Sequence, residues 1–124
     1  MQEIQSPIQG MSGMTTQSSQ NNVIQMSARE VDEVYRWSTP DGAINLSLKF
    51  VANTNNVIQI QNPTDEKHEL VIESNDRELA SSGDINPDSS AQLTFKPTMT
   101  GIFGYHCEYH PETMKGTIEV ISPS

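Results

Sequence analysis

The chain has 124 residues and a formal net charge of −9, from 16 acidic against 7 basic side chains, and it contains a single cysteine, Cys107. One domain is expected at this length, which excludes a two-lobed enzyme with a separate nucleotide domain, and the acidic excess argues against a nucleic-acid partner. The sequence has no apolar run long enough to predict a membrane span, and one cysteine excludes an internal disulfide, a two-cysteine copper centre and a four-cysteine metal site.

Residues 1–22 predict a flexible polar tail or linker, because they contain five Gln and four Ser and almost no branched apolar residue. The segment has neither the basic start nor the apolar stretch of a signal peptide, so any export signal is expected to be absent from this chain. Its Met11 and Met14 thioethers could hold Cu(I), but two thioethers in a linker make a weak site, and linker composition is the preferred explanation. Residues 23–124 are expected to form the folded domain.

From residue 23 onward, short β-rich runs alternate with turn residues. Several runs alternate apolar and polar residues, which places their apolar side chains on one face of a strand. About eight strands in about 100 residues predict an all-β fold, an antiparallel β-sandwich. The predicted strands are Val23–Met26, Val31–Trp37, Ile44–Phe50, Asn56–Gln61, His68–Glu73, Ala91–Phe95, Ile102–Cys107 and Thr117–Ile121.

Two local expectations accompany this assignment. One helical turn is predicted at Asp76–Ser81, with Asn75 as its cap. The aromatic residues Tyr35 and Trp37 lie on an alternating run and are expected in the core of the sandwich.

Metal-binding side chains gather at the end of the seventh predicted strand and in the segment that follows it. Cys107, His110 and Met114 have the spacing Cys-x-x-His-x-x-x-Met. A thiolate, an imidazole and a thioether are ligands that copper prefers. Because Cys107 ends a strand, the loop after it can bring His110 back beside the thiol.

A second imidazole is available from His68, at the start of another predicted strand. Strand alternation puts His68 on one face with Leu70, and Cys107 on one face with Tyr105. If both faces point into the sandwich, His68 and Cys107 converge at one end and His106 points away. Two His, one Cys and a weak axial Met form the blue-copper arrangement, which serves electron transfer.

Residues 101–120, GIFGYHCEYHPETMKGTIEV, resemble the C-terminal copper loop of the cupredoxins, most closely the plastocyanin and amicyanin type. Residues 57–73, with His68 after an Asn-Pro-Thr-Asp turn, resemble the strand that carries this family's first ligand histidine. The resemblance implies a Greek-key β-sandwich that binds one type 1 copper ion through His68, Cys107, His110 and Met114. It also implies cycling between Cu(I) and Cu(II) while the protein serves redox partners.

The sequence departs from the family pattern at two places. Three residues separate His110 from Met114, as in azurin-type loops, whereas amicyanin-like loops have two and plastocyanin-like loops four. Glu69 stands directly after the first histidine, where the family usually has Asn. Both departures favour an open or water-bearing axial copper position. Glu69 and Glu112 are therefore candidates to hold a copper-bound water or a proton.

An electron carrier with an acidic surface and a redox partner that docks through a basic surface is the leading hypothesis. An open axial site would instead suit an enzyme or sensor for a small molecule such as nitric oxide, as in the nitrosocyanin branch. Copper storage or delivery is a third hypothesis, and a zinc site is ranked last. Copper redox carriers of this family usually act outside the cytoplasm, so a periplasmic or cell-surface location is expected.

Overall fold

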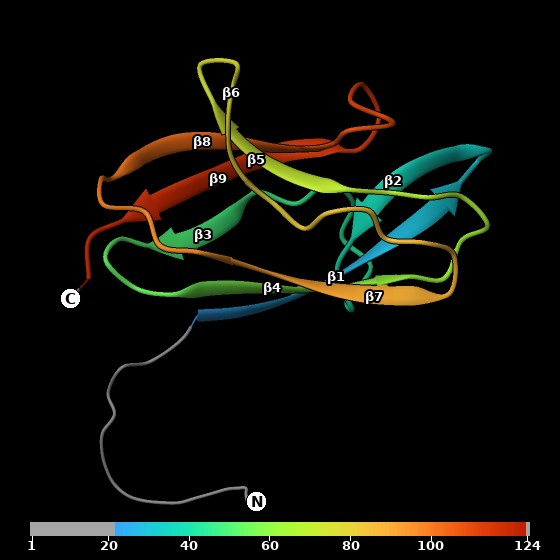
Figure 1. The fold of residues 1–124 in the computed structure, drawn as a ribbon, viewed down its shortest axis with the longest axis horizontal. Coiled ribbons are helices and arrows are strands. Elements are labelled where there is room, and N and C mark those ends of the chain that lie inside the picture. The colour runs from blue at the N-terminus through green and yellow to red at the C-terminus, as the bar shows by residue number, and fades with distance from the viewer. Residues whose placement is uncertain (1–21, 124) are drawn as a thin grey trace, which may run out of the picture.

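The computed structural model describes residues 22–123, and the predicted tail lies outside this range except for its last residue, Asn22, which begins the first strand. The described residues form nine strands that pack as two layers (Figure 1). In chain order these are β1 (Asn22–Val31), β2 (Val34–Ser38), β3 (Leu48–Val51), β4 (Asn56–Asn62), β5 (Leu70–Ser74), β6 (Arg77–Ser81), β7 (Ser89–Phe95), β8 (Gly101–Cys107) and β9 (Lys115–Ile121).

One sheet has four strands in the order β2-β1-β4-β7, and the other has five in the order β3-β9-β8-β5-β6. The β-sandwich predicted from the sequence is confirmed, but the sheets are mixed. β1 runs parallel to β4, and β3 runs parallel to β9, with Leu48 opposite Ile118. Side-chain alternation predicts which face a residue occupies but not the direction of the neighbouring strand, so the sequence could not distinguish these parallel pairs.

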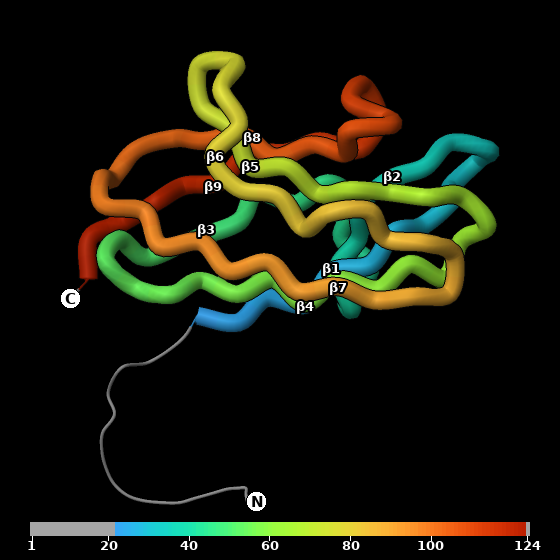
Figure 2. The backbone as a smooth tube through the Cα atoms, in the orientation of Figure 1, coloured from blue at the N-terminus to red at the C-terminus, as the bar shows by residue number. Residues whose placement is uncertain are grey.

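The predicted helical turn at Asp76–Ser81 is wrong, because these residues contribute to an antiparallel hairpin made by β5 and β6. The two residues between the strands, Asn75 and Asp76, have φ of 53° and 62°. Positive φ at both central positions is the mark of a type I′ turn, whose twist matches that of the strands it joins. The hairpin stands away from the body of the sandwich (Figure 2).

The predicted strand Ile44–Phe50 is shorter in the structure, where only Leu48–Val51 forms β3. Leu48 and Phe50 are buried as expected, but Ile44 and Leu46 are 39% and 41% exposed. Asn45 interrupts the run with a φ of 49°. Its side-chain oxygen accepts a hydrogen bond from the backbone N–H of Trp37, so this residue leaves the extended conformation to tie two segments together.

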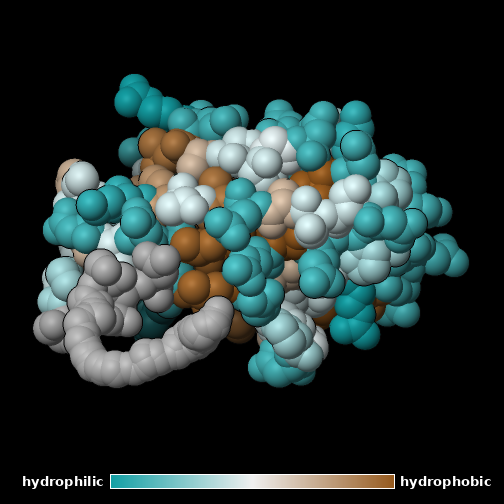
Figure 3. Space-filling view, turned by 60° about the horizontal axis from the view of Figure 1, so that its bottom comes forward, coloured by the Kyte–Doolittle hydropathy of each residue, from teal (hydrophilic) through white to brown (hydrophobic). Residues whose placement is uncertain are grey.

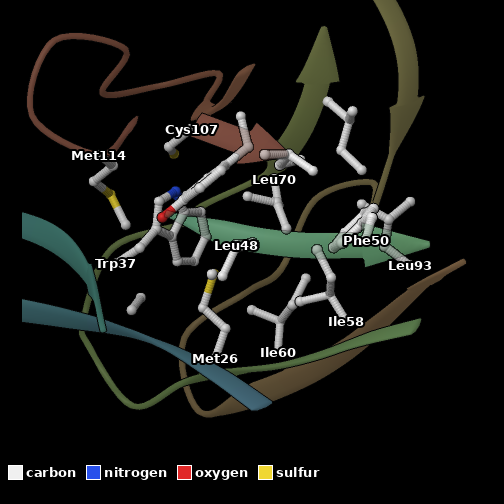
Figure 4. Close-up of a cluster of buried hydrophobic side chains, with 14 of the residues drawn as sticks. Met26, Trp37, Leu48, Phe50, Ile58, Ile60, Leu70, Leu93, Cys107 and Met114 are labelled. Carbon is white, nitrogen blue, oxygen red and sulfur yellow. The ribbon is translucent and has the colours of Figure 1, made fainter. Parts of the chain in front are cut away.

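The hydrophobic core lies between the two sheets. Its largest fully buried side chains include Trp37, Tyr105, Phe50, Ile58 and Ile72. Figure 4 shows Cys107, Met114 and Trp37 at one end of this core, and Phe50 and Leu93 at the other. Each fully buried side chain of this size contributes about 1.5–3 kcal/mol to folding, so the core gives the end that contains Cys107 a rigid base.

Hydrophilic residues cover most of the face seen in Figure 3, with hydrophobic surface confined to patches among them. Within residues 22–123, the structure has no helix long and apolar enough to cross a membrane.

Candidate metal centre

The loop between β8 and β9 folds back on the end of β8. The N–H of His110 donates to the carbonyl of Cys107 at 3.1 Å, and the N–H of Met114 donates to the carbonyl of His110 at 3.0 Å. The N–H of Cys107 donates in turn to the carbonyl of Met114 at 2.8 Å. These backbone hydrogen bonds form two consecutive turns, one from Cys107 to His110 and one from His110 to Met114. His110 and Met114 therefore both lie beside Cys107.

His68 reaches the same place from the other side of the fold. It precedes β5 and forms an isolated bridge with Ile85, through bonds of 3.1 Å and 2.7 Å. Leu70, two residues on, lies directly opposite Cys107 in the register of β5 and β8. The predicted convergence of His68 and Cys107 at one end of the sandwich is therefore observed.

The three donor atoms face one another. The Sγ of Cys107 lies 3.7 Å from Nδ1 of His68 and 3.7 Å from Nδ1 of His110, and all three donors lie within 4.8 Å of one another. A first-row ion about 2.0–2.3 Å from nitrogen and sulfur donors, with about 120° between them, places these donors about 3.7 Å apart. The three side chains would thus be able to hold a single copper ion.

The hydrogen bonds around His68 leave Nδ1 free to act as a donor atom. Its Nε2 lies 2.9 Å from the hydroxyl of Thr64, and this hydroxyl donates its own proton to Oδ1 of Asn62 at 2.6 Å. The proton on the imidazole is therefore assigned to Nε2. Burial, with the charge of His110 as a second cause, lowers the pKa of His68 to about 4, so the ring is neutral at pH 7.

Cys107 is fully buried, and this burial raises the pKa of its thiol. The backbone N–H of Glu69 points at Sγ, with a distance of 3.5 Å, and favours the ionised form. Because a metal binds the thiolate, loading this site releases the thiol proton.

Met114 is also fully buried, beside Cys107 and Trp37 in the core (Figure 4). Its backbone is held against Cys107, which keeps its thioether at the same end of the fold as the three other donors. This placement is compatible with the predicted axial ligand.

Comparisons with known proteins assign the chain to a family. The profile of the cupredoxin-like domain matches residues 16–120. The chain belongs to this family. Together with the donor set, membership identifies copper, one ion per chain, as the cofactor of this cupredoxin.

Solved structures agree with the fold. Auracyanin A, a blue copper protein from Chloroflexus aurantiacus, superposes with a TM-score of 0.65 at 14% identity, covering 82% of this chain and 100% of that one. Reduced rusticyanin superposes with a TM-score of 0.65 at 19% identity, covering 85% of this chain and 82% of rusticyanin. Auracyanin from Roseiflexus castenholzii superposes with a TM-score of 0.60 at 15% identity, covering 81% of this chain and 97% of that auracyanin. A comparison with curated proteins gives no match.

His106, the third histidine of this cupredoxin, points away from the donor cluster, as strand alternation predicts. Its Nδ1 lies 3.1 Å from a carboxylate oxygen of Glu73, and its Nε2 lies 3.5 Å from one of Glu108. The side chain therefore pairs with acidic residues on the outer face of the sheet.

The two carboxylates predicted to serve a copper-bound water have different surroundings. Glu69 accepts a hydrogen bond from the hydroxyl of Ser81, which ties the start of β5 to the end of β6. Glu112 is exposed in the loop between β8 and β9. A role for either residue in holding water or a proton stays a prediction.

Several residues that support the site were not identified from the sequence. Trp37 lies in the core as expected, whereas Tyr35 is half-buried at the edge of the core and packs against the rings of His68 and His110. Arg36 and Asn45 both donate to the carbonyl of Thr113, at 3.2 Å and 2.8 Å. Arg36 is 77 residues and Asn45 68 residues from Thr113 in the sequence, so no local sequence pattern predicts these contacts.

Proposed function

We propose that this cupredoxin is a one-electron carrier whose copper ion is held by His68, Cys107 and His110, with Met114 as axial ligand. The observation that carries this proposal is the set of two imidazole nitrogens, each 3.7 Å from one buried cysteine sulfur. Copper supplies a one-electron change between Cu(I) and Cu(II), and this soft donor set suits both oxidation states.

The chain's own contribution is to hold the donors still and to leave one of them near solvent. His68, Cys107 and Met114 are fully buried, whereas His110 is partly exposed. The burial of Met114 supports a closed axial position over an open one. We therefore assign the exposed edge of His110 as the path by which electrons enter and leave.

A partner with a basic docking surface fits the charges around His110. Asp65 bonds to Tyr35, which packs on His110, Asp84 bonds to Tyr109, and Glu112 lies in the His110 loop. Among the bases of the same region, Lys67 is paired with Asp84 at 3.7 Å, and Arg36 is bonded to the carbonyl of Thr113. Charge complementarity of this kind raises the rate of encounter between redox proteins. We also propose that residues 23–124 form the copper domain and that it works outside the cytoplasm.

The first experiment compares wild-type protein with Cys107→Ser after loading with Cu(II). Wild-type protein is expected to show an intense thiolate-to-copper absorption band and a reversible one-electron voltammetric wave, and Cys107→Ser is expected to show neither. A band that persists without the thiol would overturn the assignment of Cys107 as ligand.

Added azide or nitric oxide then separates the carrier from the small-molecule alternatives. A spectrum that does not respond supports the closed site with Met114 bound. A spectrum that shifts favours an open axial position and a reaction with, or sensing of, a small molecule. Rapid loss of Cu(I) to a chelator, with no reversible wave, would favour copper storage or delivery.

A further inference from the structure

Tyr35 belongs to an aromatic cluster at the copper end. Its ring centroid is 5.1 Å from that of His68 and 5.1 Å from that of His110, and the two imidazole centroids are also 5.1 Å apart. The three rings thus form an equilateral triangle, with interplanar angles of 65°, 53° and 49°. Edge-on and tilted contacts at this distance are favourable arrangements of aromatic rings.

The hydroxyl end of Tyr35 is anchored as well. It donates to Oδ1 of Asp65 at 2.8 Å. Asp65 follows Thr64, whose hydroxyl contacts Nε2 of His68 at 2.9 Å. The ring of Tyr35 is therefore held by the same turn that orients His68, and it has little freedom to withdraw from the imidazoles.

The strand that contains Tyr35 is also hydrogen-bonded to the loop that contains His110. Arg36, the next residue of β2, donates to the carbonyl of Thr113 at 3.2 Å. β2 belongs to the four-stranded sheet, whereas β5, which follows His68, and β8, which ends at Cys107, belong to the five-stranded one. The contacts of β2 therefore join the two sheets at the copper end.

We propose that Tyr35 is a positioning residue that holds the imidazoles of His68 and His110 in one arrangement while the oxidation state of the copper changes. The proposal rests on the electron-carrier function proposed above. Electron transfer is fast when the ligands move little between the two oxidation states, because any movement adds to the barrier. A planar ring in contact with both imidazoles restricts their tilt, and an aliphatic side chain at the same place leaves them free to move.

The test compares three variants of the copper-loaded protein. Tyr35→Leu removes the ring, Tyr35→Phe keeps the ring and removes the bond to Asp65, and Phe103→Leu is the matched control. Phe103 is a half-buried aromatic residue of β8, and its ring centroid lies 6.1 Å from that of Phe95, toward the other end of the core. The readouts are the Cu(II) electron paramagnetic resonance spectrum, the electron self-exchange rate between oxidised and reduced copies, and the unfolding midpoint.

Tyr35→Leu is expected to slow self-exchange by about two- to tenfold and to broaden the resonance spectrum, whereas Tyr35→Phe, which keeps the ring but loses its bond to Asp65, is expected to show a smaller change. Phe103→Leu is expected to lower the unfolding midpoint without changing either copper readout. Wild-type self-exchange and an unchanged spectrum in Tyr35→Leu would overturn the proposal. An equal loss in Tyr35→Phe would also overturn it, since the hydroxyl rather than the ring would then be responsible.

A measurement on metal-free protein distinguishes this inference from the proposed function. Nuclear Overhauser contacts from the Tyr35 ring to both imidazoles are expected in the metal-free wild-type chain, and their absence overturns the positioning role. If the contacts are present but loaded wild-type protein shows no reversible one-electron wave, the carrier proposal fails and the positioning proposal, which rests on it, fails with it. A reversible wave with unaltered self-exchange in Tyr35→Leu overturns the positioning role alone.

Discussion

His68 is a fully buried polar side chain whose two ring nitrogens have separate tasks. Nε2 is bonded to Thr64, and Nδ1 faces the sulfur of Cys107. A buried imidazole kept neutral in this way is ready to bind a metal, because no proton must leave it first. The same burial makes the ring a source of pH sensitivity in the metal-free chain.

Metal-free protein is expected to lose stability as the pH falls from 7 toward 4. In the unfolded chain His68 titrates near its ordinary pKa of about 6.5, whereas in the folded chain its pKa is about 4. Between about pH 4 and pH 6.5 the unfolded state binds a proton at His68 and the folded state does not, so acid favours unfolding. Above about pH 6.5 His68 is neutral in both states, and its effect on the pH dependence of stability disappears. Urea midpoints measured across this range for wild type and His68→Gln give the contribution by difference. Equal slopes in the two proteins would contradict the expectation.

Removing the Thr64 hydroxyl is expected to weaken copper binding. Thr64→Val keeps the shape of the side chain but leaves Nε2 of His68 without its partner. Losing such a contact behind a metal-binding histidine typically costs about 10–100-fold in affinity. Competition with a Cu(I) chelator measures the effect, and Thr64→Ser, which retains a hydroxyl, is expected to bind nearly as wild type. Wild-type affinity in Thr64→Val would show that the contact does not orient His68.

Among the elements, the β5–β6 hairpin combines a tight turn at its tip with a contact to Glu69, which lies between His68 and β5. Ser81 near its base accepts the N–H of Gly83 at 2.9 Å and donates to Glu69. The turn residues Asn75 and Asp76 lie at the far tip of the hairpin, which stands out from the sandwich (Figure 1). The tip can therefore be altered without touching the metal centre.

Asp76→Gly is expected to stabilise the protein by up to about 1 kcal/mol. Asp76 has a φ of 62°, and Asn followed by Gly is the preferred pair for a type I′ turn. Asp76→Val is the opposite case, because a β-branched residue is strained at positive φ and should lower the melting temperature. Thermal melts measure both changes, with the copper absorption band as a check on the site. A lower melting temperature for Asp76→Gly would argue against this turn type.

Local spacing was sufficient to predict much of the site. Cys107 and His110 are three residues apart and are joined by a backbone bond, so their proximity follows from the sequence alone. His68 could be added because alternation along its strand sets the face on which it lies. Tyr35 could not, since its contact with His110 depends on how the two sheets pack. The Asp76–Ser81 error has a local cause, because a two-residue Asn-Asp turn outweighs the moderate helix propensity of the residues after it.

For the molecule as a whole, the net charge of −9 leads to a test of the proposed partner with a basic docking surface. Electron transfer to a positively charged redox protein is expected to slow by about tenfold or more between about 0.01 M and 0.1 M salt. The screening length falls from about 30 Å to about 10 Å over this range, which removes the attraction that guides encounter.

Stopped-flow measurements on wild-type protein and two variants locate the charges that cause the salt dependence of electron transfer. Glu112→Gln, in the His110 loop, is expected to reduce the salt dependence. Glu119→Gln removes a charge from the end of β9 remote from Cys107 and serves as the matched control. A larger effect from Glu119 than from Glu112 would place the docking surface elsewhere.

The parallel pairing of β3 with β9 has a consequence for how the chain folds. The hydroxyls of Ser47 and Thr117, next to this pairing, bond to each other although 70 residues separate them. Contacts so distant in sequence slow folding, because a long loop must close before they form. The five-stranded sheet is complete only when the last strand docks, and the loop with His110 and Met114 lies just before that strand. The metal centre is therefore expected to take shape late in folding, after His68 and the loop of His110 and Met114 have been joined by the docking of β9.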